Sequence, residues 1–114
     1  MSGNLNFSNT KGDTFSEVDF QLKINGVNVN LTGAVIKMQL RESYNNNTAV
    51  LSLTSVGSAG ITITSASTGQ FKINQQIIDI PSRNYVYDIQ ITFSNGVVKT
   101  YIKGNFNILE EVTK

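Results

Sequence analysis

The sequence predicts a single all-β domain, folded as an antiparallel β-sandwich of seven to nine strands with at most one short helical turn. Three observations support this fold class. The 114 residues fit one domain. Apolar and polar side chains alternate with a period of two, as in strands that bury one face. Asn, Ser, Thr and Gly fill 45 of the 114 positions, a composition typical of β-proteins with many turns.

The alternation is clearest in residues 85–93, where Tyr85, Tyr87 and Ile89 are separated by residues of the opposite face. Since the two tyrosines share the face of Ile89, we expect them to pack in the core with their hydroxyls at its rim. Weaker alternation predicts strands in segments 20–24, 34–40, 51–53, 61–63, 71–73 and 98–108. Gly104 interrupts the last segment and predicts a bulge or a close approach of another backbone.

Turn signals separate these segments. Asn25-Gly26 and Asn95-Gly96 predict tight hairpins, because a type I′ turn needs positive φ at both central residues. The segment 74–82 contains the single proline, Pro81, and is compatible either with one helical turn or with a loop that crosses between sheets.

No linker or repeat divides the chain, so we expect one domain over residues 11–114 after a flexible N-terminal arm over residues 1–10. The arm is polar apart from Leu5 and Phe7, which would also suit a short strand. We expect it to be loose unless another chain orders it, and we expect deletion of residues 1–9 to leave the fold intact. Leu5, Phe7 and Asn9 are therefore the candidate protein-interface residues.

Charge and residue usage argue against several function classes. The net charge is +1, no two Lys or Arg are adjacent and the isoelectric point is about 8.0, which disfavours nucleic-acid binding. The absence of His and Cys removes the commonest general base, zinc ligands and thiolate chemistry. There is no apolar run of membrane-spanning length and no secretion signal pattern, so we expect assembly in the cytoplasm, with no membrane, cofactor or metal.

The eight carboxylates fall mostly at predicted turns or outward strand faces. A glycosidase would need two of them facing each other across a substrate, and we expect no such pair and no enzyme. Asp88 lies within a strand, where we expect it to pair with a cross-strand lysine such as Lys99. Asp13, Glu17 and Asp19 lack the glycine-centred pattern of a calcium loop.

Aromatic residues leave one alternative open, a carbohydrate-binding β-sandwich module. Such modules usually expose Trp, and this chain has none. A sugar platform would instead have to be built from Tyr44, Tyr85, Tyr87 and Tyr101 with Arg41 and Arg83.

Several short motifs occur in a fixed order along the chain. They are Lys11-Gly12-Asp13-Thr14-Phe15, Val29-Asn30-Leu31-Thr32-Gly33, Ile36-Lys37-Met38-Gln39-Leu40-Arg41, Gly60-Ile61-Thr62-Ile63, Thr68-Gly69-Gln70-Phe71, Tyr85-Val86-Tyr87-Asp88-Ile89-Gln90, Gly104-Asn105-Phe106-Asn107-Ile108 and Glu111-Val112-Thr113. This series resembles small virion structural proteins of tailed bacteriophages. It is similar to the immunoglobulin-like N-terminal module of phage baseplate upper proteins.

The resemblance implies an immunoglobulin-like sandwich without catalytic residues, built into the virion through contacts with capsid, fibre or baseplate proteins. It also implies a homo-oligomer or many copies on the particle, at the head, a head fibre or the tail. The longer relatives carry a receptor-binding extension that is not present before Lys114. The resemblance therefore favours an adaptor or capsid decoration module over direct host recognition.

Overall fold

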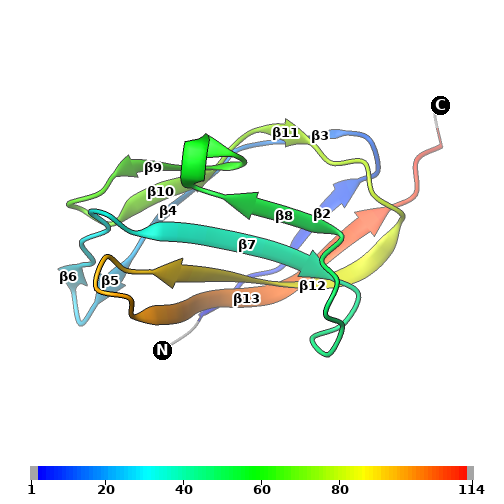
Figure 1. Cartoon of the computed structure of the whole chain (residues 1–114). Coiled ribbons are helices and arrows are strands. Elements are labelled where there is room, and N and C mark those ends of the chain that lie inside the picture. The colour runs from blue at the N-terminus through cyan, green and yellow to red at the C-terminus, as the bar shows by residue number, and fades with distance from the viewer. Residues whose placement is uncertain (1–2, 113–114) are drawn as a thin grey trace.

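A computed structural model describes residues 3–112, whose regular secondary structure is β-strand apart from one short 3₁₀ turn (Figure 1). The strands of four residues or more are β2 (Phe7–Thr10), β4 (Val18–Gln21), β7 (Val35–Arg41), β8 (Leu51–Thr54), β9 (Ile61–Ser65), β10 (Gln70–Ile73), β12 (Arg83–Thr92) and β13 (Val98–Leu109). Two-residue strands are β1 (Gly3–Asn4), β3 (Thr14–Phe15), β5 (Lys23–Ile24), β6 (Val27–Asn28) and β11 (Gln76–Ile77). The predicted all-β fold class is confirmed.

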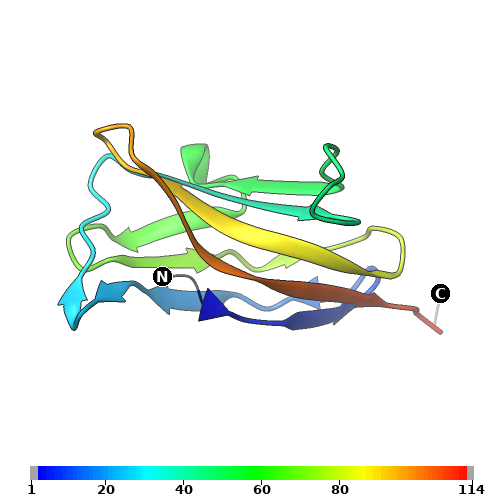
Figure 2. The same cartoon turned by 90° about the horizontal axis from the view of Figure 1, so that it is seen from below.

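The strands form two main layers, seen from two directions in Figures 1 and 2. The larger sheet has the order β1-β13-β12-β7-β8, with β2 also paired to β13, and the smaller has the order β4-β10-β9. An immunoglobulin sandwich places strands C, F and G in one sheet and B, E and D in the other. Here β7, β12 and β13 correspond to C, F and G, and β4, β10 and β9 to B, E and D. The order is that of an immunoglobulin-like sandwich.

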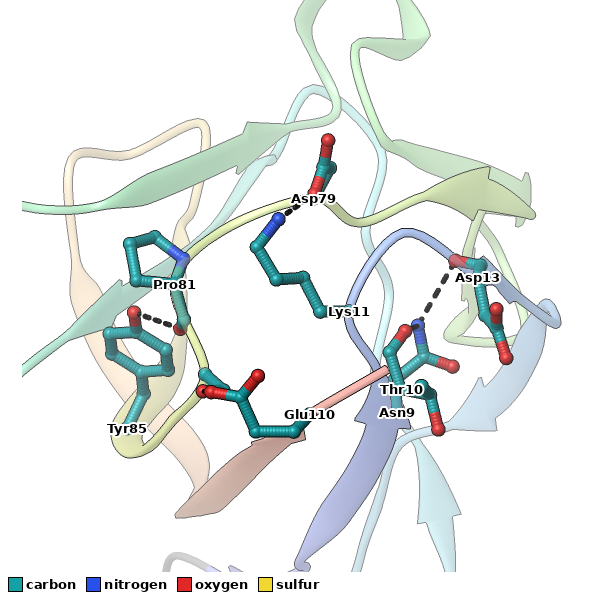
Figure 3. Close-up of polar contacts among 9 residues, drawn as sticks. Asn9, Thr10, Lys11, Asp13, Asp79, Pro81, Tyr85 and Glu110 are labelled. Atoms are coloured by element: carbon teal, nitrogen blue, oxygen red, sulfur yellow. Dashed lines mark hydrogen bonds and ion pairs between the residues drawn. The ribbon is translucent and has the colours of Figure 1, made fainter. Parts of the chain in front are cut away.

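A tyrosine corner marks the start of β12. The Tyr85 hydroxyl donates a hydrogen bond to the Pro81 carbonyl oxygen at 2.6 Å (Figure 3), the contact that immunoglobulin-type domains make at this corner. Two residues later, where antibody domains have the second cysteine of the inter-sheet disulfide, this chain has Tyr87. Both tyrosines are about 1% exposed, so the prediction that they pack in the core is confirmed.

The core lies between the two sheets and follows the alternation read from the sequence. Along β12 the residues that point inward are buried, and their neighbours are half-buried. The buried set is Phe15, Leu31, Ala34, Ile36, Met38, Leu40, Leu53, Ile61, Phe71, Ile73, Ile78, Tyr85, Tyr87, Ile89, Ile91, Phe106 and Ile108. Apart from the hydroxyls of Tyr85 and Tyr87, the buried side chains within residues 3–112 carry no polar or charged group other than the Met38 thioether. The stability of this core therefore comes from apolar burial.

The two predicted hairpins differ in their turns. Asn25 and Gly26 both have positive φ, 52° and 77°, which confirms the tight turn between β5 and β6. At the second hairpin only Gly96 has positive φ, 89°. Gly96 N–H bonds to the Phe93 carbonyl, and Phe93 N–H bonds to the Val97 carbonyl. The loop therefore has three residues, a type I turn followed by a left-handed glycine, and the two-residue prediction for this hairpin is wrong.

The helical turn lies elsewhere than the segment 74–82. Val56–Ser58 form the short 3₁₀ turn η1, whereas Gln76–Ile77 form β11, which pairs antiparallel with β3. Pairing with Thr14–Phe15 supplies backbone hydrogen bonds to Gln76–Ile77. This pairing fixes the segment by which the chain crosses from one sheet to the other. One short helical turn in the described residues agrees with the predicted limit.

Gly104 marks a close backbone approach. A Cβ atom built on it would lie 2.1 Å from the Leu5 carbonyl oxygen. The bulge in this hairpin is at a different place, because the register shifts between Ile89, which faces Ile102, and Gln90, which faces Thr100. The extra, bulged residue is therefore Tyr101, three positions before Gly104. Of the two roles predicted for Gly104, the close backbone approach is confirmed and the bulge is not.

Candidate docking surfaces

The N-terminal residues lie along the edge of the larger sheet. β1 and β2 pair in parallel with β13, with Gly3 facing Ile102 and Phe7 facing Phe106. Residues 3–10 are thus part of the sandwich, which differs from the flexible arm expected over residues 1–10. Met1 and Ser2 lie outside the described residues.

Phe7 explains why this segment is held. Its ring centroid lies 5.7 Å from that of Phe15, 5.5 Å from Tyr87 and 5.4 Å from Phe106. Aromatic pairs at such separations stabilise a core beyond the area they bury. The sequence pattern could not show this, because the partners of Phe7 come from distant segments of the chain.

Leu5 and Asn9 are fixed by hydrogen bonds within the domain. The Leu5 N–H donates to the Lys103 carbonyl at 3.0 Å, and the Leu5 carbonyl accepts from the Tyr87 hydroxyl at 2.5 Å. The Asn9 amide donates to the Asp13 carbonyl at 3.1 Å and braces the turn before β3 (Figure 3). Of the three predicted interface residues, Leu5 is the one with a substantially exposed side chain, at 40%.

A shallow groove crosses the outer face of the larger sheet, over β7 and β12. We call it the outer-face groove; its volume is about 390 Å³. Its lining comprises Lys37, Gln39, Arg41, Tyr44, Val86, Tyr87, Asp88 and Gln90. Along both strands, residues that point outward alternate with residues that point into the core. The same period of two therefore places the polar side chains together on the outer face.

Arg41 and Tyr44 form one border of the outer-face groove. The Arg41 guanidinium donates to the Asn46 carbonyl and to Gln39 Oε1, both at 2.7 Å, which fixes its plane. Tyr44 is 59% exposed, and its hydroxyl lies 3.5 Å from the Gly104 carbonyl. An aromatic ring therefore stands accessible beside a fixed cation.

Asp88 lies on the floor of the outer-face groove. It faces Gln39 on β7 and Lys103 on β13, whereas Lys99 faces Ile91. The residue opposite Asp88 is therefore a cross-strand lysine, as predicted, but it is Lys103; Lys99 is the wrong lysine because it lies nearer the turn, opposite Ile91. Burial raises the pKa of the Asp88 carboxyl, and the charge of Arg41 acts in the opposite direction. A half-buried carboxylate in a groove is a typical feature of a binding site.

The four tyrosines do not form one sugar platform. Tyr85 and Tyr87 are buried between the sheets, and Tyr101 packs edge-on against Phe93 with ring centroids 6.3 Å apart. Tyr44 alone of the four lines the outer-face groove with an exposed ring. Lys37, Gln39 and Gln90 belong to the ordered motifs but were not predicted as site residues, although their alternation with core residues would have placed them on this face.

Residues 3–112 contain no cluster of three or more acidic side chains arranged to hold a metal ion. They also form no helix of the length and apolarity needed to cross a membrane. The sequence matches no protein-family model, and no curated protein matches it significantly.

Proposed function

We propose that this chain is a non-enzymatic structural protein of a tailed-bacteriophage virion, an adaptor or decoration module that works through protein contacts. The ordered motifs between Lys11 and Thr113 support the virion assignment through their resemblance to such proteins. In the structure these motifs supply core residues and turns, for example Leu31 and Ile36, which are 0% exposed. The resemblance therefore concerns the scaffold, and partner choice depends on the exposed residues.

The observation that carries the proposal is the set of aliphatic side chains left exposed outside a filled core. They include Ile24, Val27, Val56, Ile77, Val97, Val98, Leu109 and Val112. Exposed apolar side chains that gather in space are typical of surfaces that bind other proteins. Three of the eight carboxylates, Asp79, Glu17 and Glu42, form surface ion pairs with Lys11, Lys72 and Arg83.

Analysis of purified particles tests the virion assignment. Particles from a lysate that carries the gene are banded by density, and their proteins are quantified by mass spectrometry. We expect this chain at a fixed copy number relative to the major capsid protein, retained after a high-salt wash. A chain that is abundant in the lysate but absent from intact particles would refute the proposal.

The outer-face groove supports a second candidate, binding of a carbohydrate. Its exposed Tyr44 ring, fixed Arg41 guanidinium and Asp88 carboxylate provide a stacking face and hydrogen-bonding groups, the combination that a sugar ring requires. A glycan array probed with the wild type and with Tyr44→Ala tests this candidate, with Tyr101→Phe as the matched control. Binding lost with Tyr44→Ala and kept in the control would favour it, and no binding by the wild type would exclude it for the glycans tested.

A further inference from the structure

Most of the exposed aliphatic residues, all except Leu5 and Val56, lie toward the two ends of an elongated molecule. The principal extents are 44 × 28 × 25 Å. Figure 1 shows the β5–β6 hairpin and the β12–β13 turn together at one end, with the C-terminus at the other. The first end exposes Ile24, Val27, Val97 and Val98, and the second exposes Ile77, Leu109 and Val112.

The first end, which we call the basic end, has a groove of mixed lining. The groove lies between the two hairpins and has a volume of about 470 Å³. Its lining comprises Ile24, Val29, Phe93, Val97 and Tyr101 together with Asn30, Thr32, Ser94, Asn95 and Lys99. Residues 22–36 and 89–102 contain Lys23 and Lys99 and no Asp or Glu. The basic end therefore carries two positive charges, one of which, Lys99, lines the groove.

The basic end is also firmly built. Leu22 N–H donates to the Gly69 carbonyl, and Leu31 N–H donates to the Ala66 carbonyl. A Cβ atom on Gly69 would lie 2.6 Å from the Val29 carbonyl oxygen. The β9–β10 turn thus backs the β5–β6 hairpin at close range, so the groove is held in shape before any partner binds.

The second end, the acidic end, is formed by residues 10–13, 77–83 and 109–112. Lys11 bonds to Asp79 at 2.7 Å (Figure 3), and Gly12 lies against Glu111 and Asp79. These segments contain the four carboxylates Asp13, Asp79, Glu110 and Glu111 against the two cations Lys11 and Arg83. The acidic end therefore carries a net charge of −2, beside the projecting side chains of Ile77, Leu109 and Val112.

We propose that copies of this chain bind end to end, with the acidic end of one copy seated on the basic end of the next. The two ends have opposite charge, and one offers a groove with apolar side chains in its lining where the other offers exposed aliphatic side chains. This is a heterologous contact, which repeats along an array instead of closing a symmetric dimer. The inference concerns the isolated chain and does not rest on the virion proposal.

The size of the ends predicts a weak contact. The 28 × 25 Å cross-section allows roughly 500–700 Å² per partner, below the roughly 800 Å² of a standard interface. We expect self-association in the micromolar-to-millimolar range in solution, strengthened where many copies are tethered side by side. Added salt should weaken it, since it screens the exposed charges.

Sedimentation velocity and small-angle X-ray scattering between about 20 μM and 1 mM test the proposal. We expect the wild type to form concentration-dependent oligomers whose maximum dimension approaches multiples of the 44 Å long axis. A side-by-side dimer would not lengthen the particle in this way. A wild type that is monomeric at 1 mM, or that associates without lengthening, would overturn the proposal.

Charge reversal gives the decisive comparison. Lys23→Glu/Lys99→Glu makes both ends acidic, and Glu110→Lys/Glu111→Lys makes both ends basic. Each variant alone should remain monomeric, and an equimolar mixture should associate because complementary ends meet again. Lys37→Glu/Lys103→Glu, which changes the same net charge on the sheet face, should associate like the wild type.

Two results of the charge-reversal experiment would contradict the proposal. Association of either end variant at the wild-type level, or failure of the mixture to associate, would overturn the proposal. Circular dichroism of each variant confirms that the sandwich is folded, and all four substituted side chains at the ends lie outside the buried core.

Discussion

Replacing Phe7 by Ala tests whether the N-terminal strands are part of the folded domain. Complete truncation of a buried Phe to Ala costs about 3–5 kcal/mol. Phe7 is half-buried but contacts three other rings, Phe15, Tyr87 and Phe106. We therefore expect a loss of about 2–4 kcal/mol. That is a large fraction of the roughly 5–15 kcal/mol by which a domain is stable.

The measurement is urea unfolding followed by circular dichroism. With a slope of about 1–1.5 kcal/mol per molar urea for a domain of this size, the midpoint should fall by roughly 2 M. Ser8→Ala is the matched control, because Ser8 is exposed on the same strand. It should change the free energy of unfolding by less than about 0.5 kcal/mol. A midpoint for Phe7→Ala equal to that of the control would refute the packing argument and restore the free arm.

Three further predictions concern the larger sheet. Gly104→Ala should cost about 1–3 kcal/mol in urea unfolding, because its Cβ would lie 2.1 Å from the Leu5 carbonyl oxygen and must displace β1 or β13; an unchanged midpoint would contradict the close approach. Tyr85→Phe should cost about 1–2 kcal/mol, since the Pro81 carbonyl loses its donor, and no loss would show that water replaces the hydroxyl. Asp88→Asn should make the pH dependence of stability flatter. The pKa of Asp88 is raised in the folded state, so between the ordinary pKa of 3.8 and the raised value the folded state binds more protons than the unfolded state. The free energy of unfolding of the wild type therefore falls as the pH rises through this window. Identical pH profiles of wild type and variant would count against this.

The larger part of the fold could be predicted from the sequence, because one physical pattern determines it. Alternation at Tyr85, Tyr87 and Ile89 gave both the strand and the buried face, and burial in the structure agrees. The geometry of the loops was harder to predict from the sequence. The Asn95-Gly96 signal is the same as that of Asn25-Gly26, but a third residue in the second loop changes the turn.

The candidate surfaces were harder to predict, since they depend on contacts between distant segments. Phe7 meets residues that lie up to 99 positions away in the chain, and a polar sequence around one Phe looks like a loose arm until its partners are known. Asp88 illustrates a second limit. Its cross-strand neighbour is a lysine, but it is Lys103, whereas Lys99 lies nearer the turn and faces Ile91. The three-residue loop and the extra residue at Tyr101 together set this register, and no local pattern marks that bulge.

The docked N-terminus also changes which surfaces remain for partners. β13 is the longest strand, with 12 residues, and β1 and β2 cover its outer edge. The other sheet edges are β8, β4 and β9, which have 4, 4 and 5 residues. Short edges offer few backbone groups to a neighbour's strand, so side-by-side pairing of two domains through their sheet edges would form few hydrogen bonds. The ends of the sandwich have no such constraint, because their loops present side chains and charge directly. An array of these domains is therefore expected to grow along the strand direction, and displacing β1 and β2 would expose the one long edge able to redirect it.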